Sequence, residues 1–415
     1  MNAYHLPVAA LLIGHYLLGV VAEWLNLRHL TTELPTEFKG YYDPEKYRRS
    51  QEYLRDNARL ELLTDTFRTA IVLGFMFLGG FAFLDRTVRS LGLGPVGSGL
   101  VFCGILLLGM RLLMLPFSIY HTFVIEERYG FNKTSLGTFV LDFLKSVLLM
   151  VLIGGGTLAV LFWIFERAGA AAWLYCWAAM IAFQTVLVWL APYVIMPLFN
   201  KFLPLPPGEL RTALENYARE QHFHFRDLFT MDGSRRSTKT NAFFTGFGRS
   251  RRVVLFDTLI ERHSVPELVA IVAHEAGHWK KHHVPFALLR SAFFSGLTFY
   301  LFALFLKRGA SFLNAFQIEQ TSVYASLVIF SIIYGPQATA VGIIENAISR
   351  AHEYEADAFA VATCETPEAL AEALKKLSVE NLSNLTPHPL KVLLDYSHPP
   401  VLARLRRLTT RKPTV

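Results

Sequence analysis

The sequence predicts a mainly α-helical membrane protein with seven transmembrane helices and a polar insert that contains a small β-sheet. Three observations support this fold class. Hydrophobic residues make up 53% of the 415-residue chain and charged residues only 18%, below the roughly 25% usual in soluble domains. The apolar residues gather in seven runs, most of them close to the roughly 20 residues that a membrane-spanning helix needs. Between the fifth and sixth runs lies a polar segment with short strand-like patterns.

A buried core helix would explain one apolar run, but not seven. The first run is long enough for a signal peptide, but its leading residues, MNAYHLP, contain no lysine or arginine, so a retained helix is expected. The expected spans are residues 6–26, 69–85, 98–119, 146–165, 171–193, 286–306 and 323–344.

The basic residues predict the orientation of these spans. Residues 27–68 contain eight lysines and arginines, whereas residues 86–97 contain two. The positive-inside rule then places the N-terminus outside and the 27–68 loop in the cytoplasm. With seven spans, residues 200–285 and 345–415 are cytoplasmic as well. The formal net charge of +7 is thereby explained by topology, without a nucleic-acid partner.

Ionisable residues within or beside the expected spans have two interpretations. They are structural ion pairs, or they line a hydrated chamber between the helices. These residues are His15, Glu23, Arg111, Asp142, Lys145 and Arg290.

The spans divide the chain into four parts. The first five spans occupy residues 1–199, the insert residues 200–285, the last two spans residues 286–344, and the C-terminal cytoplasmic part residues 345–415.

Within the insert, a helix is expected over 209–221, followed by strands over 227–233, 241–248 and 251–259. A turn is expected at 246–250. A second helix begins at the capping box formed by Ser264 and Glu267 and runs to about His283.

This second helix carries the sequence HEAGH at residues 274–278. His274 and His278 are four residues apart and share one helix face, so both can bind one metal ion. Glu275 is offset by one position, from which it reaches a water beside the metal as a general base. The alternative is a polar helix face without a ligand. His282 and His283 are interpreted as interfacial polar residues.

A catalytic zinc usually has three protein ligands, and the third is expected in SRAHEYEADAFA, residues 349–360. Glu353 and Asp357 are four residues apart and share a face. Glu353 would complete a His₂Glu site, and Asp357 would orient a ligand histidine. Glu355 lies on another face, and His352 is a rival ligand. The alternative is an ordinary acidic amphipathic helix.

Together these motifs resemble the type I CAAX prenyl proteases, which are integral-membrane zinc metallopeptidases. The resemblance extends over most of the chain. Beyond the two metal motifs, it rests on VIEERYGFNK (124–133), NAFFTGFGRSRRVVLFDTLI (241–260) and YSHPPVLARL (396–405).

The resemblance implies seven helices around a hydrated chamber, closed by a cytoplasmic zinc domain of gluzincin type. It implies one zinc ion per chain, bound by His274, His278 and Glu353, with Glu275 as general base. By the same resemblance, Asn241 and Ala242 bind the substrate backbone, His398 stabilises the tetrahedral intermediate, and Arg404 is a basic residue near the substrate.

The predicted function is therefore that of a zinc endopeptidase in a membrane, acting on a peptide or protein substrate that carries a C-terminal lipid in the eukaryotic family. The compact chain, without long loop inserts, favours a bacterial inner membrane over the endoplasmic reticulum. Two alternatives remain at this point: a general quality-control protease, and a transporter or scaffold with a non-catalytic metal site.

Overall fold

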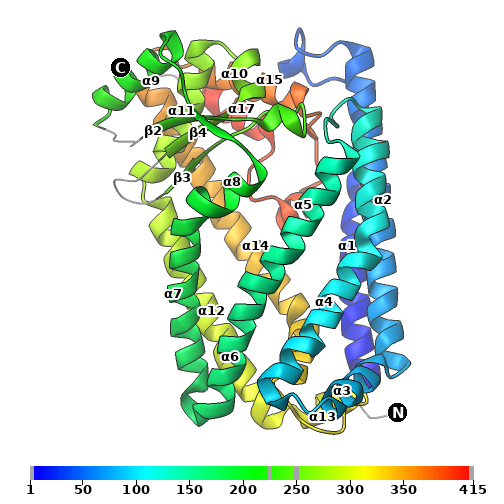
Figure 1. The fold of residues 1–415 in the computed structure, drawn as a ribbon. Coiled ribbons are helices and arrows are strands. Elements are labelled where there is room, and N and C mark those ends of the chain that lie inside the picture. Colours follow the sequence, from blue (N-terminus) through cyan, green and yellow to red (C-terminus); the bar gives the residue numbers. More distant parts are fainter. Residues whose placement is uncertain (1–3, 223–226, 247–251, 411–415) are drawn as a thin grey trace.

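The computed structural model describes residues 4–222, 227–246 and 252–410. Long helices form a bundle that is covered at one end by a cap of short helices and a small sheet (Figure 1). Six helical segments are long and apolar enough to span a membrane, and a bent pair supplies the seventh. The bundle helices are α1 (His5–His29), α2 (Pro44–Phe77), α4 (Gly94–Tyr120), α5 (Leu136–Leu149), α6 (Gly156–Arg167), α7 (Ala172–Leu190), α12 (His283–Arg308) and α14 (Val323–Thr363).

The second span differs from its prediction. The expected helix over 69–85 is interrupted at Gly79, which has a left-handed φ of 73°, and α3 (Gly80–Ser90) continues at an angle of 65° to α2. In the other direction, α2 begins at Pro44, where Asp43 accepts a hydrogen bond from the Lys46 backbone N–H at 2.8 Å. Most of the expected 27–68 loop is therefore helical, because local ion pairs support a helix outside the lipid.

Other spans are longer than predicted. The fourth begins at Leu136, ten residues before the expected start, where Ser135 caps the helix by accepting from the Thr138 N–H at 3.2 Å. It consists of α5 and α6, joined by a π-helical turn (Met150–Gly155). The seventh, α14, has 41 residues, contains Pro336 and continues past its expected end at 344 into the acidic motif. The membrane span and the acidic motif are thus one helix.

The cap contains a four-stranded sheet in the order β1-β2-β4-β3. β2 (Asp227–Met231) and β4 (Arg252–Phe256) are parallel, and β3 (Ala242–Thr245) is an edge strand antiparallel to β4. β1 (Phe202–Pro204) was not predicted, because three residues that include a proline form no alternating pattern. Of the turn expected at 246–250, only Gly246 lies within the described residues.

Short helices complete the molecule. At the cap end they are α8 (Met196–Phe199), α9 (Glu209–Glu220), α10 (Asp257–Arg262), α11 (Val265–Lys280), α15 (Ala369–Glu380), α16 (Pro389–Asp395) and α17 (Val401–Thr410). At the opposite end α13 (Ala310–Ala315) lies beside α3 (Figure 1).

Helix α11 is the centre of the cap. Leu268 and Val272 face the sheet and pack with Val253 and Leu255. The alanines on another side of α11 pack in the core shared with α14, α15 and α17. The predicted capping box is present, since the Glu267 carboxylate accepts from the Ser264 N–H at 3.1 Å. A helix that is apolar on most sides is buried, and α11 is held from both sides.

Most of the ionisable residues in the spans have partners on other segments. Arg290 pairs with Glu345 at 3.1 Å, Asp142 with Arg236 at 2.8 Å, and Glu23 with Lys391 at 2.7 Å. Two others form hydrogen bonds: His15 with the Thr339 hydroxyl, and Lys145 with the Leu198 carbonyl. The Arg111 guanidinium lies 5.1 Å from the centre of the Phe143 ring. The ion-pair interpretation therefore holds for several of these residues.

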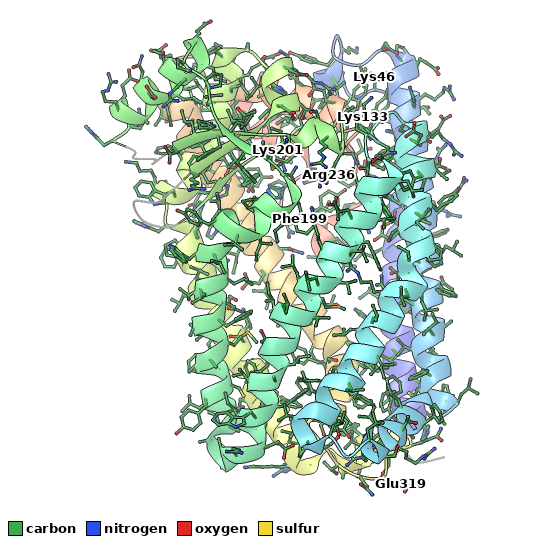
Figure 2. The ribbon with its side chains drawn as sticks, in the orientation of Figure 1. Lys46, Lys133, Phe199, Lys201, Arg236 and Glu319 are labelled. Atoms are coloured by element: carbon green, nitrogen blue, oxygen red, sulfur yellow. The ribbon has the colours of Figure 1, made fainter. Side chains whose placement is uncertain are left out.

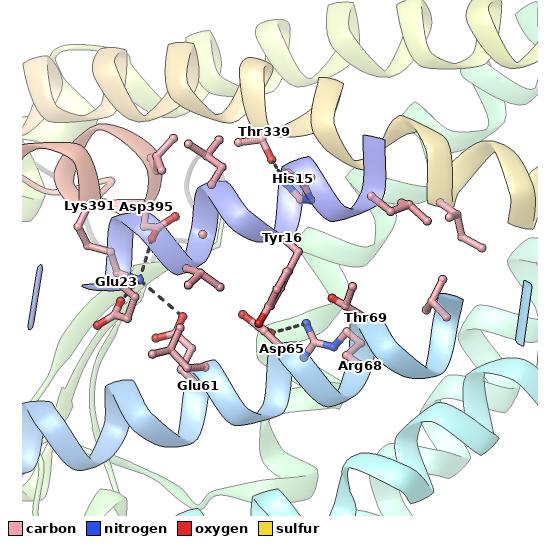
Figure 3. A pocket seen from close by; sticks show the side chains of 18 residues that line it. His15, Tyr16, Glu23, Glu61, Asp65, Arg68, Thr69, Thr339, Lys391 and Asp395 are labelled. Carbon is pink, nitrogen blue, oxygen red and sulfur yellow. Dashed lines mark hydrogen bonds and ion pairs between the residues drawn. The ribbon is translucent and has the colours of Figure 1, made fainter. Parts of the chain in front are cut away.

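These polar groups also border hollows inside the bundle. One hollow of about 400 Å³ lies between α1, α2, α14 and α16 and is lined by His15, Glu61 and Lys391, among others (Figure 3). Two neighbouring hollows, toward α4 and α5, share Arg68 with it as a lining residue. Charged residues at this depth are tolerated where water reaches them, so the lining agrees with a hydrated chamber.

The two ends of the bundle are distinct. Lys46, Lys133, Lys201 and Arg236 lie at the cap end, and Glu319 lies at the opposite end (Figure 2). The seven spans carry the chain from the start of α1 at the end opposite the cap to α17 within it (Figure 1). The described part of the chain therefore has its beginning and its end on opposite sides of the bundle.

This arrangement predicts a labelling pattern. In a variant without native cysteines, an impermeant thiol reagent applied to one membrane face should react with Arg235→Cys and Thr410→Cys together, and Glu319→Cys should react only from the other face. All three side chains are exposed. Labelling of Glu319→Cys and Thr410→Cys from the same face would contradict the odd number of crossings.

Candidate metal centre

Helices α11 and α14 cross at Gly277, the glycine of the HEAGH motif. A Cβ at this position would lie 2.9 Å from the Ala356 Cα and 3.1 Å from its carbonyl oxygen. Both atoms belong to the backbone, which has no rotamer with which to avoid the contact. Glycine therefore permits a helix separation that a larger residue would prevent, and the crossing brings the residues that flank Gly277 and Ala356 together.

The crossing joins the three residues expected to bind a metal. The Nε2 atoms of His274 and His278 are 3.3 Å apart. The Glu353 carboxylate lies 3.4 Å from the first, through Oε2, and 3.1 Å from the second, through Oε1. Among the described residues, this is the group whose ligand atoms meet closely enough to hold one ion.

The donor atoms fit zinc. Nitrogen and oxygen ligands about 2.0–2.1 Å from a tetrahedral zinc lie roughly 3.3 Å from one another, which matches the separations of these three residues. The Glu353 Oε2 atom is buried and has no hydrogen-bond donor among the described residues. A cation between the three side chains would satisfy this oxygen.

Asp357 lies one turn beyond Glu353 on α14 and contacts the first histidine from behind. Its Oδ1 is 2.9 Å from the Nδ1 of His274. Arg404, from α17, donates to the same carboxylate at 2.5 and 2.9 Å and lies 3.4 Å from Glu353. Because Arg404 is buried with these carboxylates, its geometry indicates that it positions them. Contact between Arg404 and substrate remains a prediction.

The second histidine has a different partner. The Nδ1 of His278 is 3.0 Å from the Nδ1 of His283, and the Nε2 of His283 is 3.0 Å from the Glu355 carboxylate. His283 is buried and is the first residue of the candidate span His283–Arg308. His282 is exposed in the turn between α11 and α12. His352 stacks on His283 at 3.9 Å and is not a member of the three-residue ligand group.

Glu275 follows His274 and is partly buried. Burial raises the pKa of its carboxyl, and the charge of Glu353 adds to the increase, whereas the histidines His274 and His278 oppose it. A carboxyl with a raised pKa accepts a proton more readily. The position and the pKa of Glu275 both suit a general base.

The residues assigned by resemblance lie around this group. His398, in the segment between α16 and α17, has its Nε2 3.3 Å from the Glu353 Oε1 and its Nδ1 3.0 Å from the Ser397 hydroxyl. Asn241 precedes the edge strand β3, and its carbonyl accepts from the Phe256 N–H at 3.1 Å. Ala242 begins β3 and packs with the residues of α11 that face the sheet.

Comparison with protein families agrees with this geometry. Residues 204–412 match peptidase family M48, and residues 23–201 match the CAAX prenyl protease N-terminal region, described as five membrane helices. The chain belongs to the CAAX prenyl protease branch of peptidase family M48. It is thus a membrane metallopeptidase, of a family that implies a bound metal, generally zinc.

Whole-chain relatives extend the match. The CAAX prenyl protease 1 homolog of Arabidopsis thaliana is 33% identical over 416 residues, which cover 97% of this chain and 98% of that protein. The Homo sapiens homolog is 32% identical and covers 92% and 90%. The crystal structure of S. mikatae Ste24p superimposes with a TM-score of 0.92 at 32% identity, covering 98% and 99%. The fold of the Ste24p structure is therefore shared along nearly the whole chain.

The helix crossing predicts that Gly277→Ala will reduce zinc content and destabilise the protein. The added Cβ must push α11 away from α14, at a cost of about 1–3 kcal/mol for overpacking, and the ligand atoms then separate. Metal analysis and thermal unfolding of the purified protein measure both effects.

Gly342→Ala is the matched control on α14, because a Cβ there would meet no atom within 4 Å. It should keep full zinc and an unchanged or higher unfolding temperature, since alanine favours a helix by about 1 kcal/mol over glycine. A Gly277→Ala protein with normal zinc and normal unfolding would exclude the crossing as the constraint.

Proposed function

We propose that this protein is a zinc endopeptidase that cleaves peptides carrying a lipid group near their C-terminus, with one zinc ion held by His274, His278 and Glu353. The observation that carries the proposal is the meeting of these three side chains beside Glu275. The relatives are named as CAAX prenyl proteases, which supports a substrate of this class.

In this proposal the substrate backbone extends the sheet. β3 is one of the two edge strands of the described sheet and packs on α11, the helix that carries both histidines. A peptide that pairs with an edge strand binds through main-chain hydrogen bonds. Asn241 and Ala242 stand at the start of this strand and would hold the residues on either side of the scissile bond.

Protein groups then perform the proton transfers. Glu275 takes a proton from the attacking water and passes it to the leaving amine, which is general base and then general acid catalysis. His398 donates a hydrogen bond to the oxygen that gains negative charge. Zinc, when bound, supplies the Lewis acidity that polarises the carbonyl and lowers the pKa of a water. Asp357 holds the ring of His274, and Arg404 holds Asp357 and Glu353.

The bundle interior would receive the lipid. The hollows that share Arg68 have apolar walls with polar groups among them, such as Leu12, Val72 and Met114 beside His15 and Glu61. This mixture suits a substrate with an apolar tail and a polar peptide. A transporter or scaffold with a structural metal site is less well supported, because structural zinc has four protein ligands and the group among the described residues has three.

The proposed location follows from the basic residues. The cap and the metal centre would face the cytoplasm, with the start of α1 outside. The bacterial inner membrane is a prediction that rests on the compactness of the chain alone. The relatives described above come from eukaryotes and do not support it.

The general-base role predicts that Glu275→Gln keeps its zinc but loses hydrolysis by about 10²–10⁴-fold, because the ligands remain and the base does not. Peptide hydrolysis and metal content of the purified protein measure the two properties. Glu353→Ala is the contrasting variant and should lose most of its zinc. Substantial activity in a zinc-loaded Glu275→Gln protein would remove Glu275 from the mechanism.

Lipid recognition predicts a difference between two substrates. A farnesylated CAAX peptide should be cleaved with a kcat/KM at least about tenfold above its unmodified twin, which is the effect of burying roughly two methylene groups at about 0.8 kcal/mol each. Detergent-solubilised enzyme should be used, with free and micelle-bound peptide quantified separately. Equal efficiencies would reject recognition of the lipid and leave a general zinc endopeptidase.

A further inference from the structure

His283 is delivered to the metal centre by the turn between α11 and α12. His282 has a left-handed φ of 57°, and this reversal lets the first residue of α12 point back at α11. His283 is 5% exposed, and its ring contacts both His278 and Glu355. A buried imidazole in contact with a ligand histidine is suited to act on that ligand.

We propose that His283 and Glu355 form an outer-sphere relay that fixes the tautomer and orientation of His278, so that both are positioning residues for the metal. The inference rests on the proposed metal centre. It assigns a role to His283, whose sequence context indicated only a polar residue at the membrane interface. It also assigns one to Glu355, which does not share a helix face with Glu353.

The hydrogen-bond chain determines every proton position. The Nε2 of His278 faces Glu353 and His274, so its lone pair must be free for a metal. A neutral His278 therefore carries its proton on Nδ1 and donates it to the Nδ1 of His283. His283 in turn carries its own proton on Nε2 and donates it to the Glu355 carboxylate. The Glu355 carboxylate thus determines, through His283, that the Nε2 of His278 is the nitrogen available to a metal.

Packing prevents the His283 ring from leaving this orientation. His352 stacks on it with ring centres 3.9 Å apart and an angle of 5° between the planes. Two turns further into the bundle, the Arg290–Glu345 pair links the same two helices, α12 and α14. The relay is therefore anchored in both transmembrane helices.

Helix α14 serves both ligand histidines, in two different ways. Asp357 shares a face with Glu353 and reaches His274 directly. Glu355 is two residues from each of them, roughly 160° around the helix, and reaches His278 only through His283. The His283 imidazole lies between the Glu355 carboxylate and the His278 ring. In this way an acid on the other face of α14 acts on the same metal centre.

The test measures zinc affinity of the full-length, detergent-solubilised protein by competition with a chelator, starting from metal-free protein. His283→Phe keeps the stacking on His352 but removes the acceptor, and should bind zinc about 10–100-fold more weakly. His283→Asn places an amide oxygen near the position of Nδ1. It should stay within about threefold of the wild type, because an amide oxygen is an acceptor in every state.

Glu355 supplies the second arm. Glu355→Gln should weaken zinc binding about 3–10-fold when His283 is present and should have no effect in combination with His283→Asn, which needs no carboxylate to fix its acceptor. Glu368→Gln, at another exposed acid, is the matched control and should leave affinity unchanged.

The outcomes separate the relay from the metal centre. Equal affinities for His283→Phe and His283→Asn, or a Glu355→Gln effect that persists beside His283→Asn, would overturn the relay. If His283→Phe fails to fold, the comparison of Glu355→Gln with and without His283→Asn decides alone. Absence of zinc binding by the wild type, or unchanged binding in His278→Ala, would instead refute the metal centre itself.

Discussion

The candidate metal centre depends on one close approach between two helix backbones. Gly277 of α11 meets Ala356 of α14 where a Cβ would lie 2.9 Å from a backbone carbon. His274 stands three residues before Gly277 and His278 one residue after it, and Glu353 stands three residues before Ala356. The sheet holds α11 from one side, and α15 and α17 hold it from the other. The surrounding cap keeps two helices at a separation that neither would maintain alone.

Buried charge is the second constraint at the crossing. Glu353, Asp357 and Arg404 are each less than 10% exposed, although burying a charge is costly unless it is paired and hydrogen-bonded. Arg404 contacts both carboxylates and so satisfies part of this requirement. The oxygen of Glu353 that no donor satisfies is the one a cation would occupy. This oxygen lies 3.4 Å from both Arg404 and His274 but accepts no hydrogen bond, which leaves it available for the proposed ligand role.

Sequence periodicity was sufficient where the relevant residues lie on one element. The pairs His274 with His278 and Glu353 with Asp357 follow from the helical repeat, because residues four apart always share a face. His398 and Arg404 come from other elements, so only the family resemblance indicated them. The contact between His283 and His278 depends on a left-handed backbone at His282. The sequence contains no glycine or asparagine at this position that would have indicated such a conformation. The start of α2 was missed because hydropathy detects lipid contact and not helices in water.

Helix α14 is one continuous helix that includes a membrane span and part of the cap. At about 1.5 Å per residue its 41 residues extend roughly 60 Å, longer than a bilayer is thick, and its cap end carries Glu353, Glu355 and Asp357. Glu353 lies 17 residues beyond Pro336, about 26 Å along the axis. A pivot of about 5° at Pro336 would displace Glu353 by roughly 2 Å, enough to separate it from the two histidines. Because one continuous helix links the membrane span to Glu353, a change in the tilt of α14 against its neighbours within the bundle would be transmitted directly to the three side chains of the candidate metal centre.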